Sequence, residues 1–130
     1  MTLTLYASTA AVFLILDAIM LTLVMKPLFT RHIGPLMAEP IRLAPAAIFY
    51  LAYVAGLVYL VSLPAVKTGA PVLIPAFIIG LMAYGTYEFT SWSIMKNWHW
   101  TMVATDTLWG GALTALSAWA GVAITRAVHG

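Results

Sequence analysis

Apolar residues run through this chain in four long stretches, separated by short segments that hold most of its polar residues. Each stretch is long enough to cross about 30 Å of hydrocarbon, which takes roughly 20 helical residues. An open sheet is excluded because its edge groups would be unpaired in lipid, and four strands are too few for a closed barrel. We therefore predict an all-α membrane protein, a single domain over residues 1–130, with spans at about 4–25, 44–64, 72–95 and 99–124.

Composition makes lipid the main solvent of this chain. Hydrophobic residues make up 63% of it and charged residues 8%, whereas a soluble domain carries about 25% charged residues. The six basic and four acidic residues form no basic cluster, so nucleic acid is not an expected partner. Cysteine is absent, which excludes disulfides, thiol catalysis and Cys-ligated metals.

Prolines and lysines lie near the expected ends of the predicted spans. Lys26 and Pro27 are expected to end the first span, Pro64 the second and Lys96 the third. Pro45 falls in the first turn of the second span, where its missing N–H does no harm. The first span lacks a basic segment before its apolar core and a clear small-residue cleavage site, so we expect it to be retained.

The distribution of basic residues predicts the orientation. Lys67 and Arg126 would lie on the side of the termini. Four basic residues would lie on the other side, at the membrane interface of the first and third connections: Lys26, Arg31, Arg42 and Lys96. This four-to-two imbalance predicts that both termini are outside and that connections one and three are cytoplasmic.

The first connection, about 26–43, is the only long one. Pro27, Pro35 and Pro40 would interrupt any long helix there. A short amphipathic helix on the membrane surface and an ordinary loop both fit this pattern. The helical interpretation rests on four apolar residues at helical spacing: Phe29, Ile33, Leu36 and Met37.

Three tryptophans surround the third connection, namely Trp92, Trp98 and Trp100. Tryptophan is enriched where a membrane meets water, because its ring is amphipathic. We therefore interpret these residues as an interfacial aromatic belt rather than as part of a ligand site.

Three of the four carboxylates, Asp17, Glu88 and Asp106, fall inside the predicted spans, and the fourth, Glu39, falls in the first connection. Each intramembrane carboxylate costs about 2.5–3.5 kcal/mol at a helix centre on insertion scales, so it normally faces the bundle interior. At a rise of about 1.5 Å per residue, all three lie roughly 10–13 Å from connections one and three. They therefore form one polar layer.

Tyrosines reach the same depth and complete this layer. A phenol can donate a hydrogen bond to a carboxylate and can stay satisfied when that carboxylate is protonated. Three neighbouring carboxylates in a low dielectric cannot all remain ionised without cations. They can share protons, receive an inward-reaching basic side chain or hold a metal, and we expect neither a metal nor another cofactor because no His lies firmly within a span. The candidate binding residues are Asp17, Glu88, Asp106, Tyr50, Tyr53, Tyr84 and Tyr87.

A stripe of small and polar residues follows Asp106 along the fourth span. Residues of this kind at three- or four-residue spacing let another helix approach closely. The stripe is therefore interpreted as a helix-packing face, and it consists of Gly110, Thr114, Ser117 and Gly121.

Several stretches of the chain, including LDAIMLTLVMKP, GLMAYGTYEFTSWSIMKNW and TDTLWGGALTALSAWAG, resemble the small bacterial membrane proteins of domain-of-unknown-function family twenty-one seventy-seven. The resemblance covers nearly the whole chain and is most specific over residues 80–110. Glu88 stands where the family pattern has Asp, and Ser91 where it has Asn. The resemblance implies a four-span protein of the bacterial inner membrane. It implies no activity.

Three functions remain open. The polar layer can bind or relay a proton, an ion or a small ligand, and transport by so thin a bundle would favour a homo-oligomer or larger complex. The chain can instead be an accessory or structural subunit of a membrane complex or lipid-handling system. A lipid-acting enzyme ranks last, because no nucleophile elbow, P-loop, HExxH or redox motif is present. Membrane lipid is the expected surrounding partner in each case.

Overall fold

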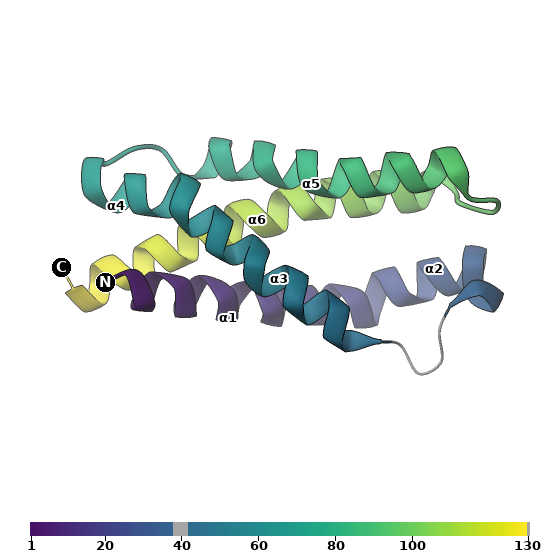
Figure 1. The fold of residues 1–130 in the computed structure, drawn as a ribbon, viewed down its shortest axis with the longest axis horizontal. Helices are drawn as coiled ribbons and strands as arrows, with labels where there is room; N and C mark the ends of the chain where they lie inside the picture. The colour runs from purple at the N-terminus through teal and green to yellow at the C-terminus, as the bar shows by residue number, and fades with distance from the viewer. Residues whose placement is uncertain (38–41, 130) are drawn as a thin grey trace.

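The computed structural model describes residues 1–37 and 42–129, and four long helical segments account for most of them (Figure 1). The first segment joins α1 (Thr2–Met20), the π-helical turn η1 (Leu21–Met25), α2 (Lys26–Ile33) and the 3₁₀ turn η2 (Gly34–Leu36). The second joins α3 (Leu43–Leu57), the π-helical turn η3 (Val58–Ser62) and α4 (Leu63–Thr68). The third and fourth are α5 (Leu73–Ile94) and α6 (Trp100–His129). No strand occurs in the described part of the chain, and the predicted all-α class is confirmed.

All four segments are long and apolar enough to cross a membrane. The 22 residues of α5 extend about 33 Å at about 1.5 Å per residue, close to the hydrocarbon thickness. The 30 residues of α6 extend about 45 Å by the same rise, so α6 either tilts or projects beyond the hydrocarbon.

Pro27 and Pro64 do not end their helices, contrary to the sequence prediction. Each lies at the second position of a new α-helical stretch that directly follows a π-helical turn. A proline inside an α-helix lacks an N–H, and its ring collides with a carbonyl one turn earlier. The wider π turn gives the ring room, which lets both helices continue. The second segment ends instead at Gly69, whose φ of 74° is the left-handed conformation typical of a helix end.

The predicted amphipathic segment of the first connection is α2, and it is continuous with the first span. Ile33 is buried in a cluster with Trp98, Met102 and Val103, and Phe29 packs against this cluster. Part of the apolar face of α2 therefore packs against Trp98 and the start of α6. The rest of this connection, residues 38–41 with Glu39 and Pro40, lies outside the described residues.

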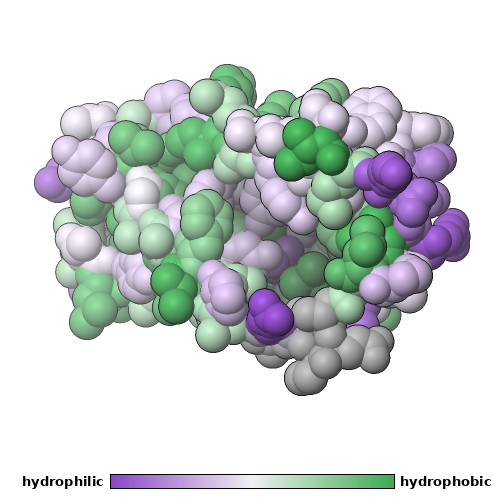
Figure 2. Space-filling model, turned by 45° about the vertical axis from the view of Figure 1, so that its right-hand side comes forward, coloured by the Kyte–Doolittle hydropathy of each residue, from purple (hydrophilic) through white to green (hydrophobic). Residues whose placement is uncertain are grey.

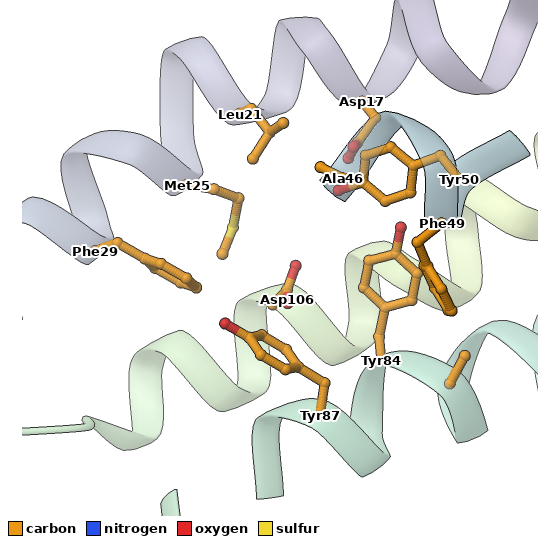
Figure 3. Close-up of a pocket in the computed structure, with 11 residues that line it drawn as sticks. Asp17, Leu21, Met25, Phe29, Ala46, Phe49, Tyr50, Tyr84, Tyr87 and Asp106 are labelled. Carbon is orange, nitrogen blue, oxygen red and sulfur yellow. The ribbon is translucent and has the colours of Figure 1, made fainter. Parts of the chain in front are cut away.

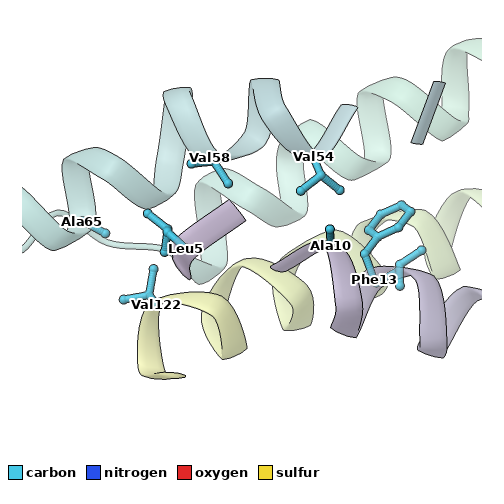
Figure 4. Packing of buried hydrophobic residues seen from close by; sticks show 8 residues of the cluster. Leu5, Ala10, Phe13, Val54, Val58, Ala65 and Val122 are labelled. Carbon is cyan, nitrogen blue, oxygen red and sulfur yellow. The ribbon is translucent and has the colours of Figure 1, made fainter. Parts of the chain in front are cut away.

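Helix α6 is the central element of the bundle. Half of its most apolar stretch is buried, compared with 17% of the corresponding stretch of α5. Helices α5 and α1 pack along α6, and α3 crosses α1 obliquely (Figure 1). The largest apolar cluster joins α1, α3, α4 and α6 (Figure 4), with Leu5, Phe13, Val54, Leu113 and Val122 among its buried members.

Two close approaches of helices depend on glycine. A Cβ atom at Gly80 would collide with the carbonyl group of Gly110, so these residues let α5 and α6 touch along their backbones. A Cβ atom at Gly121 would collide with the Thr9 hydroxyl group, so α1 and α6 meet there equally closely. Small residues at helix crossings are typical of membrane proteins, in which packing rather than hydrophobicity drives helix association.

Candidate functional site

A cavity of about 440 Å³ lies between the helices, on the side of the bundle where α3 begins (Figure 3). All four helical segments contribute to it, and the space-filling view of one face shows a hollow with hydrophilic residues at its base (Figure 2). Its volume falls in the range of about 300–1,000 Å³ that is usual for small-molecule sites. The lining residues are Asp17, Leu21, Met25, Phe29, Ala46, Phe49, Tyr50, Ala83, Tyr84, Tyr87 and Asp106.

Asp17 and Asp106 bring two carboxyl groups to the cavity from α1 and α6. Asp17 is 3% exposed, and its Oδ1 accepts a hydrogen bond from Trp109 Nε1 at 3.2 Å. Its Oδ2 is buried and has no hydrogen-bond partner among the described residues. Asp106 is 9% exposed and points into the cavity between Met25 and Tyr87 (Figure 3). The carboxyl groups of Asp17 and Asp106 therefore place strong hydrogen-bond acceptors at the cavity wall.

Glu88 does not line the cavity but lies behind Asp106, with no exposed surface. Its Oε1 accepts a hydrogen bond from Trp98 Nε1 at 3.1 Å, and its Oε2 has no partner among the residues described. Glu88 and Asp106 lie close enough for each carboxyl group to influence the charge of the other. Two neighbouring carboxyl groups can share a hydrogen bond only when one of them is protonated.

Three of the four predicted tyrosines line the cavity, namely Tyr50, Tyr84 and Tyr87. The Tyr50 hydroxyl group faces Asp17, and the hydroxyl group of Tyr84 is buried without a partner in the described structure. Tyr53 has a different place: its hydroxyl group lies 3.0 Å from Thr114 Oγ1, and its ring packs against Phe13. Tyr53 therefore joins helices α3 and α6 and does not contact the cavity.

The four stripe residues of α6 are all buried and serve different contacts along the helix. Gly110 lies under the ring of Tyr84 and Gly121 under Thr9. Thr114 pairs with Tyr53, whereas the Ser117 hydroxyl group is buried without a described partner. The stripe thus lies against both α1 and α5.

The three tryptophans predicted at the interface have two different environments. Trp92 and Trp100 are 45% and 59% exposed, which suits lipid headgroups. Trp98 is only 6% exposed, because its ring fills the space between Phe29 and Tyr87 and its indole N–H is bonded to Glu88. The four basic residues predicted near them are exposed: Lys26, Arg31, Arg42 and Lys96.

Sequence reasoning missed the two tryptophans that donate to carboxylates. Trp109 lies three residues after Asp106, on the same face of α6, and this spacing is a signal that it points toward the polar layer. Trp98 gave no such signal, since it precedes α6 and its partner Glu88 lies in α5. The apolar wall of the cavity, formed in part by Met25, Phe29 and Phe49, was also not predicted.

The chemistry available at the cavity is reversible protonation and hydrogen bonding. Within residues 1–37 and 42–129, no three His, Cys, Asp or Glu side chains are arranged to hold a metal ion. None of the described cavity-lining residues is a serine, cysteine or lysine that could act as a nucleophile. Carboxyl groups and phenols remain as the reactive side chains.

Comparison with protein families identifies a family model that covers most of the chain. The family model described as "Predicted membrane protein (DUF2177)" matches residues 2–123, which is nearly the whole chain. No significant match to a curated protein or to a solved structure was found.

Proposed function

The chain belongs to the DUF2177 family of predicted membrane proteins, and we propose that this integral membrane protein uses the cavity to exchange protons and to bind a small ligand within the membrane. The observation that carries the proposal is the buried carboxyl group of Asp17, whose Oδ2 has no hydrogen-bond partner among the described residues, at a cavity that Asp106 also lines. The Glu88–Asp106 pair adds a place for a proton directly behind the cavity.

The cost of carboxyl groups in lipid supports this proposal. Helix packing needs only small residues and hydroxyl groups, and a hydroxyl group can bond to its own helix. Thr9 does so, since its Oγ1 donates to the carbonyl oxygen of Leu5 at 2.7 Å. A buried carboxyl group costs about 2.5–3.5 kcal/mol on insertion scales and is normally retained for function. The chain holds three of them at one depth, which helix packing does not require.

Infrared difference spectroscopy between acidic and alkaline pH tests the proposal on the purified protein in nanodiscs. Proton exchange should change the band of protonated carboxyl groups in the parent. Asp17→Asn and Asp106→Asn keep the shape of each side chain but remove its titration, so each should remove part of this change. Ser93→Ala is a matched control, because Ser93 is exposed and, among the described residues, its hydroxyl group bonds only to the Phe89 carbonyl oxygen of its own helix.

The parent spectrum alone decides the test if an amide variant fails to fold. A folded parent with no carboxyl band that responds to pH would refute proton exchange in the cavity. The role of an accessory or structural subunit would then be favoured, and co-purification with a partner in mild detergent would be the next measurement.

The orientation and the membrane form part of the same proposal. The end of α2 and the α5–α6 turn lie together at one end of the bundle (Figure 1), where the His32 and His99 rings stack with centroids 4.4 Å apart. This end carries the basic residues of connections one and three, and the termini lie at the other. The positive-inside rule then favours a bacterial inner membrane protein with both termini outside.

Reporter fusions test this orientation. Fusions after residue 129 and near Lys67 should report a periplasmic location, and a fusion near Lys96 should report a cytoplasmic one. A cytoplasmic C-terminus would overturn the proposed orientation but would leave the cavity and its chemistry unchanged.

A further inference from the structure

Among the described residues, the ionisable groups that line the cavity include acids but no bases. Asp17 and Asp106 contribute carboxyl groups from two helices, and none of the described residues that line the cavity is Lys, Arg or His. Oδ1 of the Asp17 carboxyl group accepts a hydrogen bond from the Trp109 indole N–H, and the Tyr50 hydroxyl group faces the same carboxyl group. Its Oδ2 is buried and makes no hydrogen bond of good geometry to the described residues. Ionised carboxyl groups at this wall would repel an anionic ligand and attract a cation.

The remaining walls are aromatic. Phe29, Phe49, Tyr50, Tyr84 and Tyr87 come from α2, α3 and α5, and their rings surround the space in front of the two carboxyl groups (Figure 3). The face of an aromatic ring attracts a cation, and the attraction grows when water is excluded. Rings and carboxyl groups together are the usual surroundings of a bound organic ammonium group.

Aliphatic side chains complete the cavity. Leu21, Met25, Ala46 and Ala83 offer no oxygen atoms with which to coordinate an inorganic ion. Mg²⁺ and Ca²⁺ require about six or more oxygen ligands and retain water where the protein supplies too few. A hydrocarbon substituent can pack against the same walls, and its burial is favourable because apolar surface is removed from water.

We propose that the cavity binds a small organic ammonium ion with apolar substituents, its charge facing Asp17 and Asp106 and its substituents lying among the aromatic rings. This inference rests on the proposed function and specifies the class of ligand. The single positive charge of the ammonium group balances one carboxylate and so takes the place of one proton. The cation and that proton therefore compete for the same oxygens, while the second carboxyl group can stay protonated.

Equilibrium dialysis of labelled benzyltrimethylammonium against the protein in nanodiscs tests the inference. The parent should bind the cation saturably. Neopentylbenzene has the same shape with carbon in place of the charged nitrogen, and it should fail to compete. Benzenesulfonate, an anion with the same ring, should also fail. This comparison uses only the parent protein, so it remains decisive if a variant does not fold.

Variants locate the site. Asp17→Asn and Asp106→Asn should each weaken binding about tenfold or more, which corresponds to about 1.4 kcal/mol or more of binding free energy. Tyr87→Leu should weaken it less, because one ring of several is lost. Ser93→Ala, which lies away from the cavity, should bind as the parent does.

The pH dependence gives an independent readout. Protons compete with the cation for the carboxyl oxygens of Asp17 and Asp106. The groups that face Asp17 are Tyr50, Tyr84 and Trp109. The groups that face Asp106 are Glu88 and Tyr87. Affinity for the cation should therefore fall as the pH falls. Asp106→Asn should reduce this dependence, because one of the two competing groups is gone.

Three results would overturn the inference. Equal competition by neopentylbenzene would make the cavity an apolar site without charge recognition. Displacement of the cation by Na⁺, K⁺ or Mg²⁺ at comparable concentration would assign the site to inorganic ions. Absence of saturable binding, in a protein whose infrared spectra show that Asp17 and Asp106 titrate, would leave the proton-exchanging cavity standing and remove the organic cation.

Discussion

The two ends of the bundle use polar residues in opposite ways. The closed end consists of the first turns of α1, the end of α4 and the last turns of α6. Thr9 lies directly against Gly121 there, and Arg126 Nη2 donates to the carbonyl oxygen of Ala65 at 2.9 Å. The open end holds the cavity, which carboxyl groups and large aromatic rings line.

The two ends differ in the free energy that is needed to bury their polar groups. The closed end also buries hydroxyl groups without described partners, at Ser62, Ser117 and Thr125. An unpaired hydroxyl group carries a modest penalty, and a small side chain permits close helix contact in return. The carboxyl groups of the open end cost more free energy to bury. Tight helix packing at the closed end thus stabilises a bundle whose open end buries carboxyl groups at a higher free-energy cost.

The largest expected effect comes from breaking the closed end. Gly121→Val places a Cβ atom against the Thr9 hydroxyl group and forces α1 away from α6. We expect a loss of about 2–3 kcal/mol or more in the free energy of unfolding, as overpacking commonly causes. Thermal unfolding in detergent, followed by size-exclusion chromatography, measures it.

Gly56→Val is the control for this change. Gly56 is exposed in α3, and a Cβ atom there would meet nothing within 4 Å. The same substitution should therefore leave the melting temperature nearly unchanged. Equal destabilisation by the two variants would show that helix propensity, and not the contact with Thr9, governs the result.

A smaller effect is expected at the open end. Trp109→Phe keeps a ring in place but removes the N–H that holds Asp17 Oδ1. We expect a loss of about 1–2 kcal/mol in stability, since the acceptor is a buried carboxyl group. The infrared band of Asp17 should also shift. An unshifted band would mean that the indole does not set the environment of Asp17.

The smallest effect is expected between the two ends, at the pair of Tyr53 and Thr114. Thr114→Val removes a single hydrogen bond between neutral groups and retains the shape of the side chain. In a membrane bundle such a bond contributes about 0.6 kcal/mol on average. Cation binding should be unchanged, because neither residue lines the cavity. A marked loss of binding would extend the functional site to Tyr53.

The sequence by itself determined the four helical segments and predicted a common depth for the carboxyl groups. Length and hydropathy of a span are local properties, and lipid leaves the backbone little choice except a helix. The depth of Asp17, Glu88 and Asp106 follows from the fixed rise of that helix. The membrane class and the existence of a polar layer therefore needed no tertiary structure.

Only the tertiary structure decided which members of that layer meet. The rotation of each helix about its axis depends on its neighbours, so depth alone could not separate Tyr50, which lines the cavity, from Tyr53, which bonds to Thr114. Glu88 faces Trp98 rather than the cavity for the same reason. Pro27 was misleading because the π turn that accommodates it has no clear sequence signal. The cavity itself is lined by side chains from all four helical segments, so no single span determines it.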